Sequence, residues 1–373
     1  MTKGLVGLSE GVPADVGMDA AQLQHASRQL EMAVEAGKIG AASLTVARRG
    51  TLVLGQGFGR LRPEEGAPAV EPDSVFLLAS ITKPITAWAL MLLAEEGEVS
   101  LDDPVEYYLP EFKGGLRAEI KVRHLLSHTS GMPDMLPQNT ELRRAHAPLE
   151  DFVKGALKTP LLFRPNTQFH YQSKGTLLAA EIVERISAMA LRDFERERIF
   201  APLGMETSSL GLGGRSIKDL VWCGIVAEQG EDEDNRSWGW NTNYWRDLGA
   251  PWGGMHSNGR DLAVLMQTAL DGGLCKGKRV LSAASVATMT RNQNSYLQAP
   301  WGLGWALADS IVWNSCGELV SPSTFGHSGA TGTVAWADPA RELICIVLTN
   351  NRADDGSLLR RVSNAVAAAV VEM

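Results

Sequence analysis

The chain has 373 residues, of which 45% are hydrophobic and 21% are charged, and its formal net charge is −8. This is the balance of a globular protein with two domains or one large domain. Without a basic block, the acidic charge argues against a nucleic-acid partner, because phosphate binding needs a concentrated positive patch. The longest apolar stretch, 87–94, is too short to span a bilayer, and residues 1–40 lack a signal-peptide pattern. We therefore expect a cytoplasmic protein with no membrane partner.

The first predicted elements are a helix and a hairpin. Asp19 precedes apolar residues at helical spacing that continue to Gly37, which predicts a helix from about residue 20. Apolar and polar residues then alternate on both sides of Arg49-Gly50, which predicts a β-hairpin.

From Ser80 to about residue 290 the pattern is mainly helical, with long loops between the helices. Proline is tolerated in the first turn of a helix but costs about 3 kcal/mol or more in the interior. Pro84 therefore predicts a helix that begins near Ser80. Two further helices are predicted around 177–186 and 257–270.

Strands return after residue 300. The stretches 301–308 and 332–351 are predicted as strands, the second as a pair that turns at Asp338-Pro339. A last helix follows from about Gly356.

Strands at both ends and helices between them predict an α/β (α+β) fold. In it an antiparallel sheet is flanked by helices, and a helical domain is inserted. We expect residues 1–79 and 295–373 to form the sheet domain and residues 80–294 the mainly helical domain, with the active site at their boundary.

Ser80 and Lys83 are three residues apart at this predicted helix start. The first N–H groups of a helix have no internal partner, so a serine there can attack a carbonyl while its own N–H holds the oxyanion. Positions i and i+3 share a helix face, which lets the Lys83 amine reach the Ser80 hydroxyl. A desolvated lysine can take the serine proton. The pattern also fits a plain helix cap with a solvated lysine.

Further motifs decide between these interpretations. With the stretch "SITKPIT" at 80–86 and several later motifs, the chain resembles the serine β-lactamase-like superfamily. The resemblance is to its branch of class C β-lactamases, DD-peptidases and family VIII carboxylesterases in particular. The resemblance runs from about residue 20 to the C-terminus and includes "VRHLLSHTSGMP" (122–133), "FHYQSKGTLLAAEIVERI" (169–186), "RIFAPLGM" (198–205), "GGMHSNGRDLA" (253–263) and "FGHSGATG" (325–332).

The resemblance implies roles for particular residues. Ser80 would be the acylated nucleophile, Lys83 its partner, and Tyr171 a proton shuttle. Tyrosine has an ordinary pKa of about 10, so it would serve as a base only if nearby positive charge lowered that value. The sequence does not decide between Lys83 and Tyr171 as the base.

The resemblance also implies the walls of the substrate site. His327, Ser328 and Gly329 would line one side of the pocket, with the N–H groups of Ser80 and Ala330 as oxyanion donors. Ser173 stands where the family usually has asparagine, and His327 replaces a lysine that helps β-lactamases bind a carboxylate. Both departures favour ester hydrolysis over efficient β-lactam hydrolysis.

Three other patterns in the sequence suggest a different kind of site. "GHSGA" at 326–330 lacks the last glycine and the later histidine of an α/β-hydrolase site. His124 and His128 have helical metal spacing but no HExxH glutamate, so we expect structural histidines. The tryptophan-rich stretch 238–254 predicts either core packing or a cleft wall for an acyl or aryl group, with Trp240 and Trp245 as substrate-binding candidates.

We therefore expect a serine hydrolase that acts through an acyl-enzyme on small-molecule ester, amide or β-lactam substrates, most readily a carboxylesterase. The alternatives are a β-lactamase or D-amino-acid peptidase, and a silent penicillin-binding-like protein. No metal or cofactor is expected, because the four scattered cysteines lack metal-binding spacing. The sequence does not reveal the oligomeric state.

Overall fold

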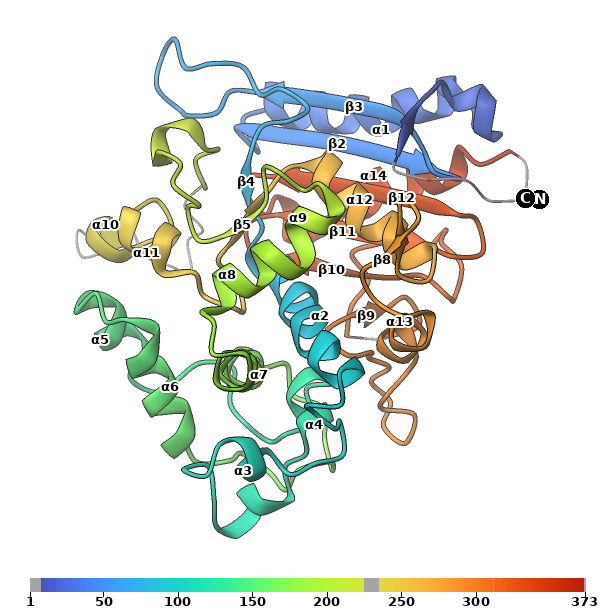
Figure 1. Ribbon diagram of the computed structural model, residues 1–373. Helices are drawn as coiled ribbons and strands as arrows, with labels where there is room; N and C mark the ends of the chain where they lie inside the picture. The colour runs from blue at the N-terminus through green and yellow to red at the C-terminus, as the bar shows by residue number, and fades with distance from the viewer. Residues whose placement is uncertain (1–7, 225–234, 311, 372–373) are drawn as a thin grey trace.

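A seven-stranded sheet built from both ends of the chain forms one part of the molecule, in the upper half of Figure 1. The computed structural model describes residues 8–224, 235–310 and 312–371. The strand order is β1-β3-β2-β12-β11-β10-β9, and only the β1–β3 pair is parallel. In that order the strands span Ser9–Glu10, Thr51–Gly59, Ala41–Arg48, Leu343–Thr349, Thr333–Asp338, Phe325–Gly329 and Ala306–Leu307. The predicted fold class, a largely antiparallel sheet with helices, is confirmed.

Both predicted strand pairs form. Strands β2 and β3 meet at Arg48 and Thr51, and the two residues between them have left-handed backbones, with φ of 50° at Arg49 and 75° at Gly50. This geometry matches the twist of a two-residue hairpin. Strands β11 and β12 pair from Asp338 and Leu343 onward, next to the predicted turn.

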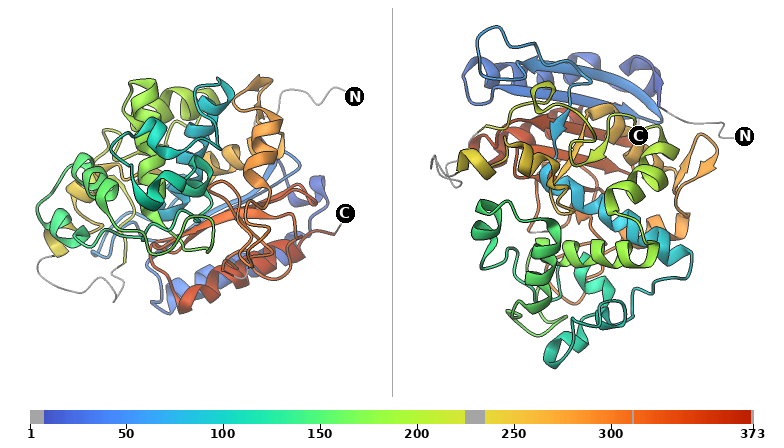
Figure 2. Two further views of the ribbon diagram at one scale, coloured as in Figure 1. Left: turned by 90° about the horizontal axis from the view of Figure 1, so that it is seen from below. Right: turned by 60° about the vertical axis from the view of Figure 1, so that its left-hand side comes forward.

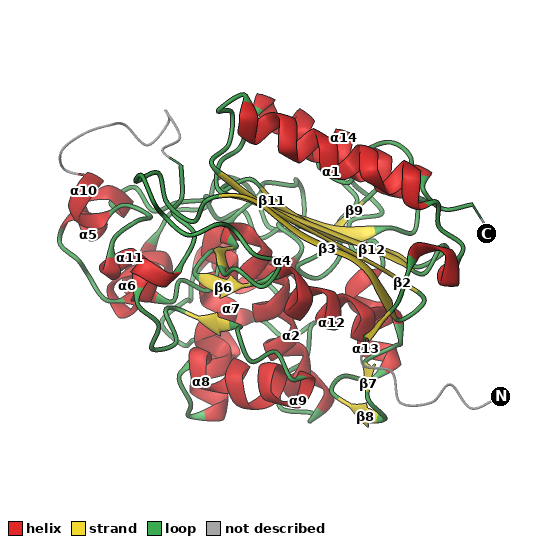
Figure 3. Ribbon diagram, turned by 90° about the horizontal axis from the view of Figure 1, so that it is seen from above, coloured by secondary structure: helices red, strands yellow, loops and turns green. Residues whose placement is uncertain are grey.

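Helices cover both faces of the sheet. The first and last long helices, α1 (Ala20–Glu35) and α14 (Ser357–Ala368), pack together over one face (Figure 3). Asp19 caps α1 by accepting hydrogen bonds from the N–H groups of Ala21 and Gln22. On the other face, α12 (Gly259–Leu270) packs against β2, β11 and β12. Because both faces are covered, every residue of β2 and β12 is buried.

A helical region lies beside the sheet, as the two views of Figure 2 show. Its central helix α2 (Thr82–Glu95) is buried from Thr82 to Leu93 and contacts α7 (Ser173–Ser187). The other helices are α3 (Val105–Tyr108), α4 (Val122–Leu126), α5 (Asn139–Arg144), α6 (Leu149–Lys158), α8 (Leu191–Glu195), α9 (Ala201–Leu203), α10 (Asn235–Trp238), α11 (Asn243–Leu248) and α13 (Ala283–Thr290). In the described ranges, no helix has the length and apolar character needed to cross a membrane.

The structure differs from the sequence-based expectation in several places. Short strands β4 (Phe76–Leu77), β6 (Met255–Ser257) and β5 (Ser209–Leu210) form a small sheet that was not predicted, and β7 (Leu274–Cys275) pairs with β8 (Lys278–Arg279). Helix α12 packs on the large sheet although it lies within 80–294. The division of the chain into two domains at 80 and 294 stays a prediction.

The predicted strand over 301–308 is wrong for most of its length, because only Ala306–Leu307 is a strand. The cause is a tight turn against α2. Gly304 has a φ of 78°, and a Cβ atom there would lie 2.8 Å from the Cβ of Ala87. A regular strand cannot follow this backbone.

Candidate functional site

Ser80 lies in a short 3₁₀ turn, Ala79–Ile81, between β4 and α2. Ala79 immediately before it has a φ of 50°, a left-handed backbone that L-residues with side chains rarely adopt. Strain of this kind persists where the surroundings hold it in place and is concentrated at functional sites. Here the Thr82 hydroxyl donates to the Ala79 carbonyl and accepts from the Met255 N–H, which fixes the turn against β6.

The C-terminal strands hold the same segment from the other side. The hydroxyls of Thr331 and Thr333 donate to the carbonyls of Leu77 and Leu78, each over 2.8 Å. Strand β10 approaches so closely that a Cβ on Gly329 would lie 2.2 Å from the Leu78 carbonyl oxygen. The Ser80 turn is therefore placed against β10 by side chains about 250 positions later in the chain.

Lys83 points back to Ser80 from the first turn of α2. Its Nζ lies 3.1 Å from the Ser80 hydroxyl and donates to the Trp252 carbonyl over 3.0 Å. The side chain is 1% exposed, and burial lowers the Lys83 pKa to about 7, with Asp134 acting in the opposite direction. A large share of these amines is therefore neutral near pH 7 and able to accept a proton.

Tyr171 lies against the same amine, with its ring centroid 4.7 Å from the Lys83 Nζ. Burial raises the pKa of Tyr171 above its usual range, although a hydrogen bond with Ser80 acts in the opposite direction. The sequence argument required a lowered tyrosine pKa for a base, and the structure gives the reverse. Tyr171 is thus suited to hold and donate a proton.

His327 on β10 is 2% exposed, and its Nδ1 lies 2.7 Å from the Ser328 carbonyl oxygen. Burial, together with the nearby Lys83 charge, lowers the pKa of His327 to about 3. The imidazole is therefore neutral at physiological pH and does not replace the positive charge of a lysine at this position.

Ser80, Tyr171 and His327 line one cavity of about 330 Å³, whereas Lys83 is not among the described residues of its lining and contacts Ser80 from behind. The cavity brings together six of the predicted site residues, which are Ser80, Tyr171, His327, Ser328, Gly329 and Ala330. The rest of its lining is formed by Phe169, Trp301, Val312, Trp313, Asn314, Ser315, Arg352, Gly356 and Leu359.

Three predicted substrate-binding residues lie elsewhere. Ser173 is buried, and its N–H donates to the Asp134 carboxylate over 2.7 Å. Trp245 is buried in the core, where the Arg143 guanidinium lies 4.0 Å from its ring. Trp240 packs against the same core cluster. None of the three is among the described residues that line the cavity. The placement of the two tryptophans corresponds to the core-packing interpretation of 238–254.

The sequence reasoning missed other residues at the site. Phe169, Trp301 and Trp313 form an aromatic wall, and the Trp313 indole donates to the Ser328 hydroxyl over 3.2 Å. Phe169 lies two positions before Tyr171 in the motif at 169–186, so its place at the site could have been expected from the sequence. Arg352 could not have been expected from the sequence. It follows β12, and only the folded arrangement of the chain brings it to the cavity.

His128 was expected to anchor a loop, and its Nδ1 does accept a hydrogen bond from the Gln172 N–H. Its ring also lies 4.5 Å from the Tyr171 ring, with a left-handed backbone of φ 61°. His124 accepts from the Lys121 N–H through its Nδ1. Across the part of the chain that the structure describes, no three metal-ligating side chains converge.

The chain is similar to known proteins over most of its length. The family model described as Beta-lactamase matches residues 26–369. A Salmonella agona (strain SL483) protein, provisionally named a D-alanyl-D-alanine carboxypeptidase, is 27% identical over 92% of this chain and 86% of its own. Two solved structures are similar in fold. A penicillin-binding protein homologue from Caulobacter crescentus has a TM-score of 0.77, 23% identity, and coverage of 95% of this chain and 99% of its own. A family VIII carboxylesterase has a TM-score of 0.75, 21% identity, and the same coverage.

Proposed function

The chain belongs to the beta-lactamase family and is a serine hydrolase, and we propose that it hydrolyses small carboxylic esters through an acyl-enzyme at Ser80. The observation that carries the proposal is the pair formed by the Ser80 hydroxyl, which lines the cavity, and the Lys83 amine 3.1 Å from it. A serine is a poor nucleophile unless a neighbour takes its proton, and this buried lysine is neutral enough to do so.

In the proposed acylation step, the neutral Lys83 amine accepts the Ser80 proton while the serine oxygen bonds to the ester carbonyl carbon. The N–H groups of Ser80 and Ala330 hold the oxyanion. The bond to the leaving alkoxide then breaks, and Tyr171 donates a proton to the departing alcohol. The Lys83 ammonium returns its proton to Tyr171, which restores both groups.

Deacylation follows the same route with water as the nucleophile. The Lys83 amine takes a proton from the water as its oxygen attacks the acyl carbon. The bond to Ser80 breaks, Tyr171 donates a proton to the serine oxygen, and a carboxylic acid leaves. The Lys83 ammonium then returns its proton to Tyr171, which restores both groups. In this scheme Lys83 is the base and Tyr171 the acid, which follows from the opposite directions of their pKa shifts.

Two features of the cavity favour esters. The aromatic wall of Phe169, Trp301 and Trp313 suits an apolar acyl or aryl group. The neutral His327 gives no charge for the carboxylate that β-lactams and peptide C-termini carry. We therefore place β-lactam turnover second.

One observation favours a second candidate, a β-lactamase or D-amino-acid peptidase. Arg352 lines the cavity, and a guanidinium is a strong partner for a carboxylate. A substrate with a negatively charged group could be held there in place of the missing lysine contact.

The test is intact-mass analysis after incubation with a fluorophosphonate, a penicillin or a p-nitrophenyl ester, in parallel with Ser80→Ala. Esterase function predicts a phosphonate adduct that peptide mapping places on Ser80, rapid ester turnover, and no lasting penicillin adduct. A lasting penicillin adduct on Ser80 would favour the second candidate. Ester turnover that survives in Ser80→Ala would contradict both.

A further inference from the structure

Lys174 is a buried amine that the proposed acyl transfer does not use. It follows Ser173 at the start of α7, its side chain is 0% exposed, and its Nζ makes no hydrogen bond to any described residue. Burying an ammonium group without a partner is costly, and an apolar side chain of similar length would avoid that cost. Core packing alone does not require a lysine here.

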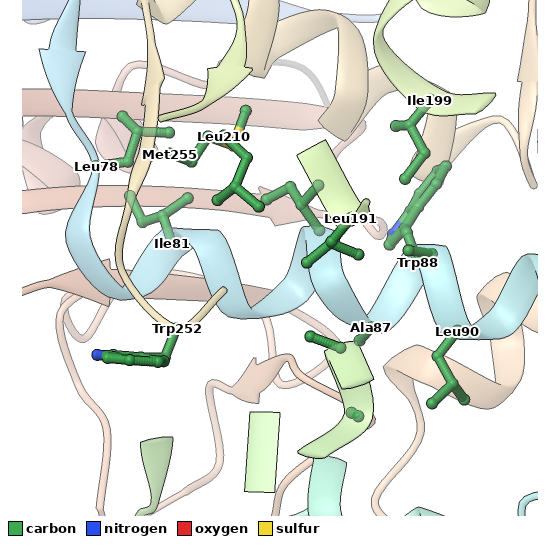
Figure 4. Close-up of a cluster of buried hydrophobic side chains, with 14 of the residues drawn as sticks. Leu78, Ile81, Ala87, Trp88, Leu90, Leu191, Ile199, Leu210, Trp252 and Met255 are labelled. Atoms are coloured by element: carbon green, nitrogen blue, oxygen red, sulfur yellow. The ribbon is translucent and has the colours of Figure 1, made fainter. Parts of the chain in front are cut away.

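Aromatic rings surround this amine. The Lys174 Nζ lies 3.9 Å from the Trp252 ring centroid and 5.6 Å from that of Phe152. The centroids of the Trp252 and Trp245 rings are 6.4 Å apart, and the Arg143 guanidinium lies 4.0 Å from the Trp245 ring centroid. A cation over an aromatic face is attracted to it, so Lys174 fixes the position of the Trp252 indole. Figure 4 shows that indole beside the start of α2.

Trp252 connects Lys174 to the reacting groups. Its backbone carbonyl accepts one of the hydrogen bonds of the Lys83 amine, over 3.0 Å. A second connection is electrostatic. The Asp134 carboxylate raises the pKa of both lysines, and the Lys83 charge lowers the pKa of Lys174. Repulsion between like charges is mutual, so a charge on Lys174 also disfavours a charge on Lys83. Burial also lowers the pKa of Lys174 to about 7.

We propose that Lys174 is a positioning residue that holds Lys83 ready to accept the Ser80 proton. Through the indole it fixes the carbonyl that orients the Lys83 amine, and its charge opposes a second charge on Lys83. This inference rests on the proposed function, because it assumes that Lys83 is the base.

Other ionisable groups face the two lysines, and they must be separated from the effect. The groups that surround the amines, or the adjacent turn of α2, are Asp134, Arg143, His128, Tyr171, His327 and Glu195. Of these, Glu195 has a pKa that burial raises to about 8, so it also titrates near neutral pH. Glu195→Gln is therefore the matched control.

The experiment measures kcat/KM for a short p-nitrophenyl ester against pH in wild type, Lys174→Met and Glu195→Gln. Without the Lys174 charge, the Lys83 pKa should rise, so the low-pH limb should move up by roughly one pH unit. Below that limb kcat/KM should fall about tenfold. Glu195→Gln should leave the limb in place. Methionine is apolar and similar in length, so Lys174→Met should unfold at or above the wild-type temperature.

A limb that stays in place in Lys174→Met, in a folded and active variant, would overturn the inference and leave the proposed function standing. A second readout needs no activity. In protein labelled with ¹³C-lysine, NMR titration should show the Lys83 midpoint rising in Lys174→Met, with signals assigned from Lys83→Met. An unchanged midpoint would also overturn the inference. Wild-type ester turnover that survives Ser80→Ala would instead reject the proposed function.

Discussion

The Lys83 amine and the Ser80 hydroxyl are 3.1 Å apart, and the lysine is almost completely shielded from water. Because burial lowers the Lys83 pKa to about 7, the amine is mostly protonated below this pH and mostly neutral above it. We expect kcat/KM for a neutral ester to rise with pH through about 7 and then to level off. A profile measured from about pH 5 to about pH 9 checks this. A flat profile would contradict the role of Lys83 as the base.

The same burial makes Lys83 costly to the fold. Its pKa is about 7 in the folded state and 10.5 ordinarily, so the unfolded chain binds more protons between these values and stability rises with pH across this window. Below about pH 7 the full cost remains. Lys83→Met should therefore be more stable than wild type near pH 6, by a few kcal/mol at most, with a smaller gain near pH 10. Its ester turnover should fall by at least ~100-fold.

Denaturant unfolding at the two pH values measures this effect. The control is Lys154→Met on α6, where the exposed lysine pairs with Glu150 and Asp151. That variant should change stability by less than about 1 kcal/mol. A Lys83→Met variant that is less stable than wild type at both pH values would show that the amine contributes net stability.

Phe169 tests the aromatic wall. It is half-buried and lines the cavity, so Phe169→Ala should raise KM for aryl esters by roughly fivefold, which corresponds to an aromatic contact worth about 1 kcal/mol. KM for an acetate ester should rise less. The control is Phe163→Ala, since that ring contacts His170 and is not among the residues that line the cavity. Equal effects of the two variants on KM would show that the aromatic wall does not contribute to substrate binding.

Arg352 tests selectivity for negatively charged substrates. It is the one lysine or arginine among the described cavity-lining residues. Arg352→Gln should lower kcat/KM for a hemisuccinate ester about thirtyfold more than for a neutral ester, because a charge-assisted hydrogen bond is worth about 2 kcal/mol. Arg361→Gln, an exposed position on α14, is the control. If the ratio of kcat/KM for the hemisuccinate ester to kcat/KM for the neutral ester is unchanged, Arg352 does not contact the carboxylate.

Gly329 tests the close packing of β10 against the Ser80 segment. A Cβ there would lie 2.2 Å from the Leu78 carbonyl oxygen and 2.3 Å from the Thr333 hydroxyl oxygen. Gly329→Ala should destabilise the fold by about 1–3 kcal/mol and lower kcat, since the Ser80 turn must move. Gly55→Ala on β3, where the nearest contact would be 3.7 Å, should have a much smaller effect. Thermal unfolding and ester turnover measure both, and a fully active Gly329→Ala would contradict the argument.

The parts of the fold that were predictable are those with local causes. The turn at Arg49-Gly50 and the helix start set by Pro84 depend on neighbouring residues, and both appeared as expected. Gly304 shows the limit, because the turn that ends the predicted strand is required by a contact with Ala87, far away in sequence.

In the site, too, the residues with local causes were predictable and those placed by distant contacts were not. Ser80 and Lys83 share one helix turn, so their contact could be expected from spacing alone. Trp245 and Arg352 could not be placed that way. A tryptophan fits a core and a cleft equally well, and the approach of Arg352 to Ser80 depends on the order of strands in the sheet.

The hydroxyls of Thr331 and Thr333 that hold the carbonyls just before Ser80 have a consequence during synthesis. A ribosome makes Ser80 and Lys83 about 250 residues before these threonines and the neighbouring Ala330. Until then the nascent chain carries the serine and its amine without the strand that completes their surroundings. We therefore expect the nascent polypeptide to lack hydrolase activity until the segment with Ala330, Thr331 and Thr333 has been translated.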